Sequence, residues 1–503
     1  MLNNLLAGFT QLFTLKTMLF VIIGAVVGLL AGAIPGLNDT NILTLFLSFI
    51  LFIDPFPAVI LMTAVFISCQ TAGSIPAILV NIPGTPSTAA STLEGYALTK
   101  QGKAGQALGC SFASSLMGTV LGGIMALVLA PIIGKYALSF GPPEMFMLAI
   151  FGMTAVASLT GNSVSKGLLA AVLGLLVGTI GLDYFIGVTR STFGVAELYS
   201  GIPQIPLLLG LFGVGELYSL IKKKSIGTGV QATDAPDVKS QMEGFKAAFR
   251  YKKSMLLSAV IGFVVGVIPG TGATIASFTS YGTARSISKE PEKFGKGHYE
   301  GLVATDTSNN ASVPGSIVPA LTLGIPGSGT TVLFISAFLM HGMQPGPSFF
   351  SEHITEANSI FLTVIFVGII ATFVGMVMAK HMVKVVSLPT HILAMLIAMF
   401  CLMGAYICRN KVNDLFIMLA FSILSIFLKK FDYPLPAFLL GVILGPIIEP
   451  NFFRALAISD NNFSIFFTRP ICIVLWIMCL AALAMPKIIA LKAKKKKEAE
   501  SAV

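Results

Sequence analysis

Apolar runs recur along the chain from one end to the other, separated by short polar stretches. The longest cover residues 18–35, 113–133, 168–188, 255–269, 359–379, 390–408, 412–428, 435–448 and 464–485. A helix of about 20 apolar residues crosses a bilayer, and lipid offers no partner for the free polar groups of an irregular backbone. The pattern predicts an all-α polytopic membrane protein with about 12 transmembrane or re-entrant segments.

Composition and charge support this class and orient the chain. Of 503 residues, 55% are hydrophobic and 11% charged, whereas soluble domains are nearer a quarter charged. Lys and Arg gather in cytoplasmic loops, so we expect a basic cytoplasmic linker at 222–253 and a Lys-rich cytoplasmic tail at 489–503. The tail can contact anionic membrane lipid. No nucleic acid binding is expected, because no basic patch carries interleaved aromatics.

Two sequence blocks occur twice, in the same order. GLLAGAIPGLNDTN (28–41) matches GFVVGVIPGTGATI (262–275), and AGSIPAILVNIPGTPST (72–88) matches PGSIVPALTLGIPGSGTT (314–331). Each block carries a Pro-Gly pair, which breaks a helix. We therefore expect a first repeat with its following helices at 1–221 and a second at 254–488.

The loop charges of the two repeats are exchanged. The segment 253–285 begins and ends at basic residues with its Pro-Gly pair near the middle, which favours a re-entrant hairpin. The matching segment of the first repeat ends at FIDPFP (52–57), without Lys or Arg. Conversely, EGYALTKQGK (94–103) is basic and HGMQPGPSFFSEH (341–353) is not. The exchange predicts two repeats of inverted topology, an architecture typical of secondary transporters.

Polar side chains cluster just after the breaks. A helix that starts there presents free N–H groups and the positive end of its dipole, which favours an anion such as a carboxylate. The predicted substrate-binding residues are Gly36, Asn38, Thr40, Asn81, Gly84, Thr85, Ser87, Gly270, Thr271, Gly272, Gly327, Ser328, Thr330 and Thr331. The alternative is that the breaks serve only kinks and close helix packing.

Oxygen-rich side chains near the same breaks suit a hard cation. The predicted cation-binding residues are Asp39, Ser74, Asp306, Ser308, Asn309 and Asn310, since acids within a membrane are usually functional. We expect Na⁺ or H⁺ as coupling ion, no transition metal and no cofactor. No Walker phosphate-binding loop or nucleophile elbow occurs, so an ion gradient, not enzymatic chemistry, is expected to drive the protein.

Four stretches resemble a known family. GAIPGLN (32–38), the block at 73–108, SYGTARSISKEPEKFGKGHYEGLVATDTSNNAS (280–312) and IVPALTLGIPGSGTT (317–331) look like the large membrane subunit of tripartite tricarboxylate transporters. The matching motif positions are 35–36, 81–87, 269–272, 308–310 and 324–328. One departure is LNDTN (37–41), where the family usually has Gly and small apolar residues, and we expect it to affect the substrate.

The resemblance implies a permease of the bacterial inner membrane. It would work with a small membrane subunit and a periplasmic solute-binding protein that captures carboxylates such as citrate, driven by a cation gradient through an elevator-like movement. The expected function is cation-coupled uptake of di- or tricarboxylates. Two alternatives are the same fold carrying a different small anionic solute, and a membrane receptor that transports nothing.

Overall fold

The computed structural model describes residues 2–34, 38–159, 163–183, 187–215, 217, 237–270, 272–385 and 390–484. Its first half contains α1 (Leu2–Leu12), α2 (Leu15–Gly32), α3 (Asp39–Ile50), α4 (Pro55–Ala72), α5 (Ser74–Val80), the 3₁₀ turn η1 (Pro86–Ala89), α6 (Thr92–Lys100), α7 (Ala104–Ala137), α8 (Pro142–Leu159), α9 (Val164–Gly178), β1 (Gly181–Leu182), β2 (Thr189–Arg190), η2 (Ala196–Leu198), α10 (Gln204–Leu208) and the π-helical η3 (Leu209–Val214).

The second half contains α12 (Val238–Ala248), η4 (Phe249–Tyr251), α13 (Lys252–Val267), α14 (Gly272–Ile287), η5 (Pro291–Lys293), α15 (Tyr299–Leu323), α16 (Gly329–Met340), α17 (Pro347–Glu352), α18 (Ile354–Val385), α19 (Thr390–Arg409), α20 (Val412–Lys430), α21 (Leu435–Ile458) and α22 (Ile465–Thr468). A further apolar helix covers Pro470–Ala484. Most of the predicted linker and all of the predicted tail lie outside the described residues.

The predicted all-helical architecture is confirmed. Six described helices are long and apolar enough to cross a membrane: Leu15–Gly32, Pro55–Val80, Ala104–Ala137, Ile354–Met382, Val412–Lys430 and Leu435–Ile458. Several shorter apolar helices accompany them, including Asp39–Ile50 and Gly329–Met340. The number of crossings and the inverted topology stay predictions, since no membrane is present.

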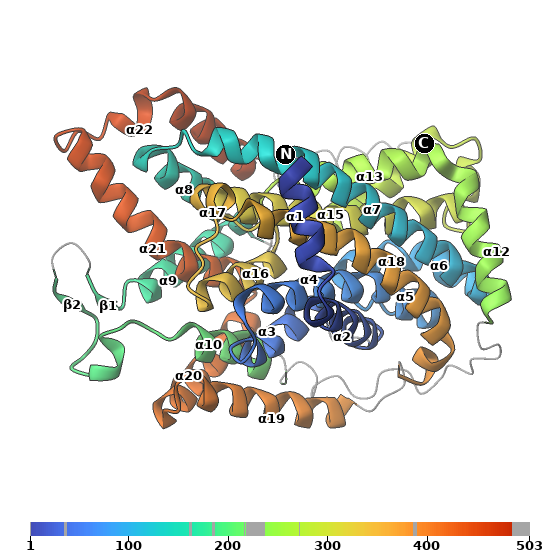
Figure 1. Ribbon diagram of the computed structural model, residues 1–503, viewed down its shortest axis with the longest axis horizontal. Coiled ribbons are helices and arrows are strands. Elements are labelled where there is room, and N and C mark those ends of the chain that lie inside the picture. The colour runs from blue at the N-terminus through green and yellow to red at the C-terminus, as the bar shows by residue number, and fades with distance from the viewer. Residues whose placement is uncertain are drawn as a thin grey trace, which may run out of the picture.

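One predicted apolar run is longer than the helix that it forms. The apolar run 168–188 is helical only to Gly178, where α9 ends. The chain then forms a short antiparallel hairpin, in which Gly181 of β1 pairs with Arg190 of β2. The hairpin projects at one edge of the molecule (Figure 1). Arg190 binds both carboxylate oxygens of Glu449 on α21, at 2.6 and 2.8 Å, and this long-range ion pair fixes the hairpin.

Long central helices carry the two repeats. α15 packs along α7, α2 packs along α4, and α13 packs along α15 (Figure 1). The last two pairs are matched in detail. A Cβ on Gly32 of α2 would lie 2.3 Å from the carbonyl oxygen of Cys69, and a Cβ on Gly266 of α13 would lie 2.3 Å from that of Ser312. Only glycine allows so close an approach of two helix backbones.

The second break has the same backbone geometry in both repeats. α5 is capped at its C-terminus by Asn81 and α15 by Gly324, both with left-handed backbone (φ 59° and 71°). The following isoleucine N–H donates to the carbonyl of Pro76 in one repeat and of Pro319 in the other, each at 3.3 Å. Positive φ is uncommon for a residue with a side chain, although asparagine tolerates it. The repeat seen in the sequence is therefore a repeat of backbone structure.

The helix that restarts after each second break is capped in the same way. The backbone N–H of Thr85 donates to the hydroxyl of Thr88 at 3.3 Å, and that of Ser328 donates to the hydroxyl of Thr331 at 2.8 Å. Both pairs are reciprocal capping boxes. A capping box satisfies backbone N–H groups that the first turn of a helix leaves unpaired.

Candidate functional site

A cavity of about 400 Å³ lies where the breaks of the two repeats meet. α3, α14 and α16 all begin at this cavity and contribute consecutive residues to its wall: 38–40, 272–275 and 328–330. A helix N-terminus carries about half a positive charge. Three such ends directed at one cavity favour an anion there through backbone groups.

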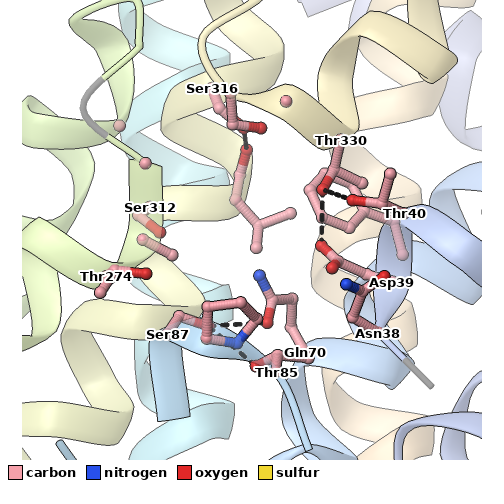
Figure 2. A pocket seen from close by; sticks show the side chains of 18 of the residues that line it. Asn38, Asp39, Thr40, Gln70, Thr85, Ser87, Thr274, Ser312, Ser316 and Thr330 are labelled. Atoms are coloured by element: carbon pink, nitrogen blue, oxygen red, sulfur yellow. Dashed lines mark hydrogen bonds between the residues drawn. The ribbon is translucent and has the colours of Figure 1, made fainter. Parts of the chain in front are cut away.

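One side of the cavity is acidic. Asp39 and its partners Thr40 and Thr330 lie together there (Figure 2). The Thr330 hydroxyl donates to Oδ2 of Asp39 at 2.8 Å and lies 3.0 Å from the Thr40 hydroxyl. These bonds join the start of α3 to the start of α16. The carboxylate is held in a fixed position and is 5% exposed.

The facing side carries amide and hydroxyl groups. The Ser87 hydroxyl donates to Oε1 of Gln70 at 3.0 Å and lies 2.9 Å from the Thr85 hydroxyl. The amide nitrogen of Gln70 points toward the middle of the cavity (Figure 2). Thr274 and Ser312 lie on the same side as Ser87 (Figure 2). This side offers hydrogen-bond donors to an anion.

Asp39 is the only charged residue among the described residues that line the cavity, and no Lys, Arg or His is found there. An anion bound in the cavity must therefore be compensated by backbone N–H groups, by hydroxyl and amide donors, or by a cation bound with it. Hydroxyl and amide groups bind a carboxylate through hydrogen bonds. They carry no fixed positive charge, which would also hold the carboxylate when it has to be released.

The cavity brings together a large part of the predicted substrate-binding residues: Asn38, Thr40, Thr85, Ser87, Gly270, Gly272, Ser328 and Thr330. Gly36 and Thr271 lie outside the described residues. The other four do not line it. Asn81 is exposed, Gly84 and Gly327 pack against backbone, and Thr331 caps α16. Their role is to shape the breaks.

The predicted cation-binding residues fall into separate places. Asp39 lines the cavity, whereas Asp306 is fully buried in the middle of α15. Oδ1 of Asp306 accepts from the hydroxyl of Ser74 at 3.1 Å and from that of Ser91. The hydroxyl of Ser111 is a further partner. No basic side chain pairs with Asp306 within the described part of the chain.

The neighbouring residues of α15 face different helices. Asn310 belongs to the Asp306 cluster: its Oδ1 accepts from Thr71 at 2.9 Å and its Nδ2 donates to the Ser115 hydroxyl at 2.9 Å. Asn309 donates to the carbonyl of Gln70 at 3.5 Å. Ser308 lies against α13, where its carbonyl approaches Gly262. The predicted set of six therefore does not form one site.

The Asp306 cluster lies next to the cavity along two short paths. Ser74 follows Gln70 by one helical turn, and Ser91 follows Ser87 by four residues. Gln70 and Ser87 line the cavity, while Ser74 and Ser91 contact Asp306. A buried carboxylate without a basic partner is costly, and the hydroxyls of Ser74 and Ser91 offset part of that cost.

Sequence reasoning left several lining residues out of the predicted site, among them Gln70, Thr274, Ser312 and Ser316. Thr274 stands at the position that matches Thr40 in the first repeat, and this match could have identified it. Gln70, Ser312 and Ser316 lie within long helices. Their place in the wall depends on how α4 and α15 pack, which no local pattern reveals.

Comparison with known proteins agrees with the architecture. Residues 18–440 match the model of the tripartite tricarboxylate transporter TctA family. A protein of Agrobacterium vitis described as "Uncharacterized 52.8 kDa protein in TAR-I ttuC' 3'region" is 30% identical over 497 residues, which are 99% of this chain and 98% of that protein. A second, from the TAR-II ttuC' 3' region of the same organism, is 32% identical over 234 residues, 45% of this chain and 95% of that protein.

The family match agrees with the resemblance seen in the sequence motifs and covers both repeats. It places the protein in a transporter family and not in an enzyme family, and together with the long apolar helices it makes the chain a multi-pass membrane protein. The chain belongs to the tripartite tricarboxylate transporter TctA family, the large membrane subunit of these transporters.

Proposed function

We propose that the protein is the permease subunit for secondary active, cation-coupled uptake of small organic carboxylates across the bacterial inner membrane, with its C-terminus in the cytoplasm. It works with a small membrane subunit and a periplasmic binding protein that delivers the solute. Di- and tricarboxylates are the first solutes to test. The observation that carries the proposal is the cavity at which α3, α14 and α16 begin without a basic side chain among the described lining residues.

Carboxylate binding follows from the donors present. The N–H groups of a helix N-terminus bind anions, and hydroxyls such as those of Thr274 and Ser87 add hydrogen bonds. A solute held this way is bound by groups that reorganise little when it leaves. That suits a transporter, which must release what it binds.

Cation coupling follows from Asp306. Its carboxylate is surrounded by hydroxyls and amides and has no basic partner among the described residues. Oxygen ligands suit Na⁺, a hard cation, and a proton would neutralise the same group. An ion bound here sits one turn from the cavity, where it lowers the cost of bringing an anion into the membrane.

The contacts between loops support an inverted arrangement of the two repeats. Near one end of the central helices, the side-chain amide of Gln101 donates to the carbonyl of Lys296 at 2.8 Å, joining two basic loops. At the other end His341 hydrogen-bonds the backbone of Ile50, joining two loops poor in Lys and Arg. We propose that the first end faces the cytoplasm and the second the periplasm, and that an elevator-like movement alternates access.

A second candidate function is transport of a different small anionic solute by the same fold. The acidic residue in the cavity favours such a solute over an inorganic anion, whose charge is fixed. A receptor that transports nothing is the remaining alternative. Uptake that depends on an ion gradient separates both transporters from the receptor.

The test uses the chain reconstituted in vesicles with its two partner subunits. Asp306→Asn and Asn310→Ala are expected to abolish gradient-driven uptake, because the first removes the carboxylate charge of the buried cluster and the second removes an amide group from it. Membrane insertion and the melting temperature in detergent serve as checks on folding. Asp460→Asn, at an exposed turn with left-handed backbone that asparagine accepts, is the matched control. Undiminished uptake by both Asp306→Asn and Asn310→Ala would show that the Asp306 cluster does not bind the coupling ion.

A further inference from the structure

We propose that Asp39 restricts the cavity to solutes with a single carboxylate group and a hydrogen-bond donor, hydroxyl or ammonium, on the opposite side. The inference rests on the proposed function, and among small organic carboxylates it excludes the di- and tricarboxylates. It comes from comparing the two halves of the cavity.

Residues at matched positions of the two repeats make up much of the cavity wall. The matched lining pairs are Asn38 and Gly272, Asp39 and Ala273, Thr40 and Thr274, Gln70 and Val313, Thr85 and Ser328, Pro86 and Gly329, and Ser87 and Thr330. Three of these pairs conserve a hydroxyl group in both halves. The pair Asp39 and Ala273 is the one that changes the charge, so the acidic side of the cavity is a departure from its own internal symmetry.

Asp39 occupies the positive end of its own helix. The backbone N–H groups of Asp39 and Thr40 donate to its carboxylate, and the Thr330 hydroxyl at the start of α16 donates as well, at 2.8 Å. The anion-binding groups of α3 are thus used by a carboxylate of the protein. At α14 the matched residue is Ala273, so the N-terminus of α14 stays open to a carboxylate of the solute.

Charge balance sets the number of carboxylates. Three helix ends supply about one and a half positive charges, and Asp39 removes one. What remains compensates one solute carboxylate in part, at the side of α14, Thr274 and Ser87. A second carboxylate would have to enter the half that Asp39 occupies, where the like charges repel. A hydroxyl or ammonium group there donates to Asp39 instead.

The experiment measures binding to the purified full-length chain by calorimetry at constant Na⁺ and pH. The probes are lactate, alanine, propionate, succinate and citrate, which vary the donor and the number of carboxylates separately. We expect lactate or alanine to bind at least tenfold more tightly than propionate, succinate and citrate. Whichever of the two binds identifies the donor as hydroxyl or ammonium.

Two variants assign that preference to Asp39. Asp39→Asn keeps the size and the bond from Thr330 but removes the charge, and Asp39→Ala reproduces the residue of the matched position. In both, we expect the tenfold preference over succinate to disappear, with succinate binding more tightly than it does to the wild type. Melting curves show that each variant is folded, and the Asn variant keeps the test valid where the Ala variant does not fold.

Tight binding of succinate or citrate by the wild type overturns the inference but does not contradict the proposed carboxylate transport. An unchanged preference in Asp39→Asn also overturns it. Failure of the folded wild type to bind any of the five probes overturns the proposed function as well.

Discussion

At the scale of single residues, glycines allow backbone segments to meet at the breaks. A Cβ on Gly84 would lie 2.5 Å from the carbonyl oxygen of Gly32, and a Cβ on Gly327 would lie 2.8 Å from that of Gly266. The obstructing atoms are backbone and cannot turn away. We predict that Gly84→Ala and Gly327→Ala each lower the melting temperature by several degrees, corresponding to about 1–3 kcal/mol, and reduce uptake. Gly282→Ala is the control, since nothing lies within 4 Å of its Cβ.

Gly282 is exposed in the interior of α14. Alanine there should be neutral or stabilise the helix by up to about 1 kcal/mol. If Gly84→Ala and Gly327→Ala melt at the wild-type temperature, the close approach at the breaks does not exist in the protein.

A buried glutamate joins the basic loops of the two repeats. Glu94 is fully buried, and its carboxylate accepts from the backbone N–H groups of Gly295 at 2.5 Å, Gly297 at 2.8 Å and His298 at 2.7 Å. The Tyr281 hydroxyl donates to it at 2.8 Å. Glu94→Gln exchanges one acceptor oxygen for a donor, so we predict a loss of about 1.5–3 kcal/mol in unfolding free energy.

Tyr281→Phe removes one of the hydrogen bonds to the same carboxylate and leaves the backbone N–H groups paired, so it should cost less than Glu94→Gln, about 1.5 kcal/mol. Denaturant or thermal unfolding of both variants measures which of them loses more stability. A larger loss for Tyr281→Phe than for Glu94→Gln would show that the loop is not held by the carboxylate.

At the scale of elements, the restart of α16 supplies part of the cavity wall. The hydroxyl of Ser328 accepts from the backbone N–H of Thr331 at 3.3 Å, which fixes the first turn. We predict that Ser328→Ala costs about 1 kcal/mol of stability and raises the half-saturating solute concentration of uptake several-fold, because the free N–H groups lose their fixed direction. Ser328→Thr keeps a capping hydroxyl and is expected to stay near the wild type. Equal half-saturation in both variants would contradict a role of the cap in binding.

The breaks themselves could be predicted from sequence, because Pro-Gly pairs act locally on the backbone. The residues that follow them, such as Thr40 and Thr85, were placed at the cavity for the same reason. Gln70 and Ser312 were not, since they lie within helices and reach the wall only through the packing of α4 and α15. Asp39 lies at the cavity, whereas Asp306 lies in the buried cluster. This difference likewise depends on which helices surround α15.

The end of α9 shows the limit of apolar patterns. Residues 168–188 are apolar enough for a crossing, yet the helix ends at Gly178 and a hairpin follows. The hairpin is joined to α21 by the pair of Arg190 with Glu449, residues 259 positions apart. A pattern read along the chain contains no information on a partner so distant.

At the scale of the whole molecule, the described contacts sort the loops into two groups. Gln101 contacts the loop at Lys296, whereas His341 contacts Ile50 and Lys16 pairs with Asp54. The first repeat thus begins near the loop where the second repeat ends. Equivalent loops of the two repeats lie in opposite groups, as expected for inverted topology and not for a tandem copy in the same orientation.

Labelling from one side of the membrane tests this arrangement. In a variant in which the six native cysteines are replaced, single cysteines are placed at Asp54 and Gln344, which are exposed in loops of the first and second repeat. Both should react with an impermeant thiol reagent applied to the periplasmic side. Cysteines at Lys103 and Lys289, exposed in the basic loops, should react only after the membrane is opened.

A parallel repeat would place Asp54 and Gln344 on opposite sides, so labelling of one without the other contradicts inversion. Labelling of all four positions in intact cells would mean that the reagent crosses the membrane, and uptake by each variant confirms that the labelled protein is the folded transporter.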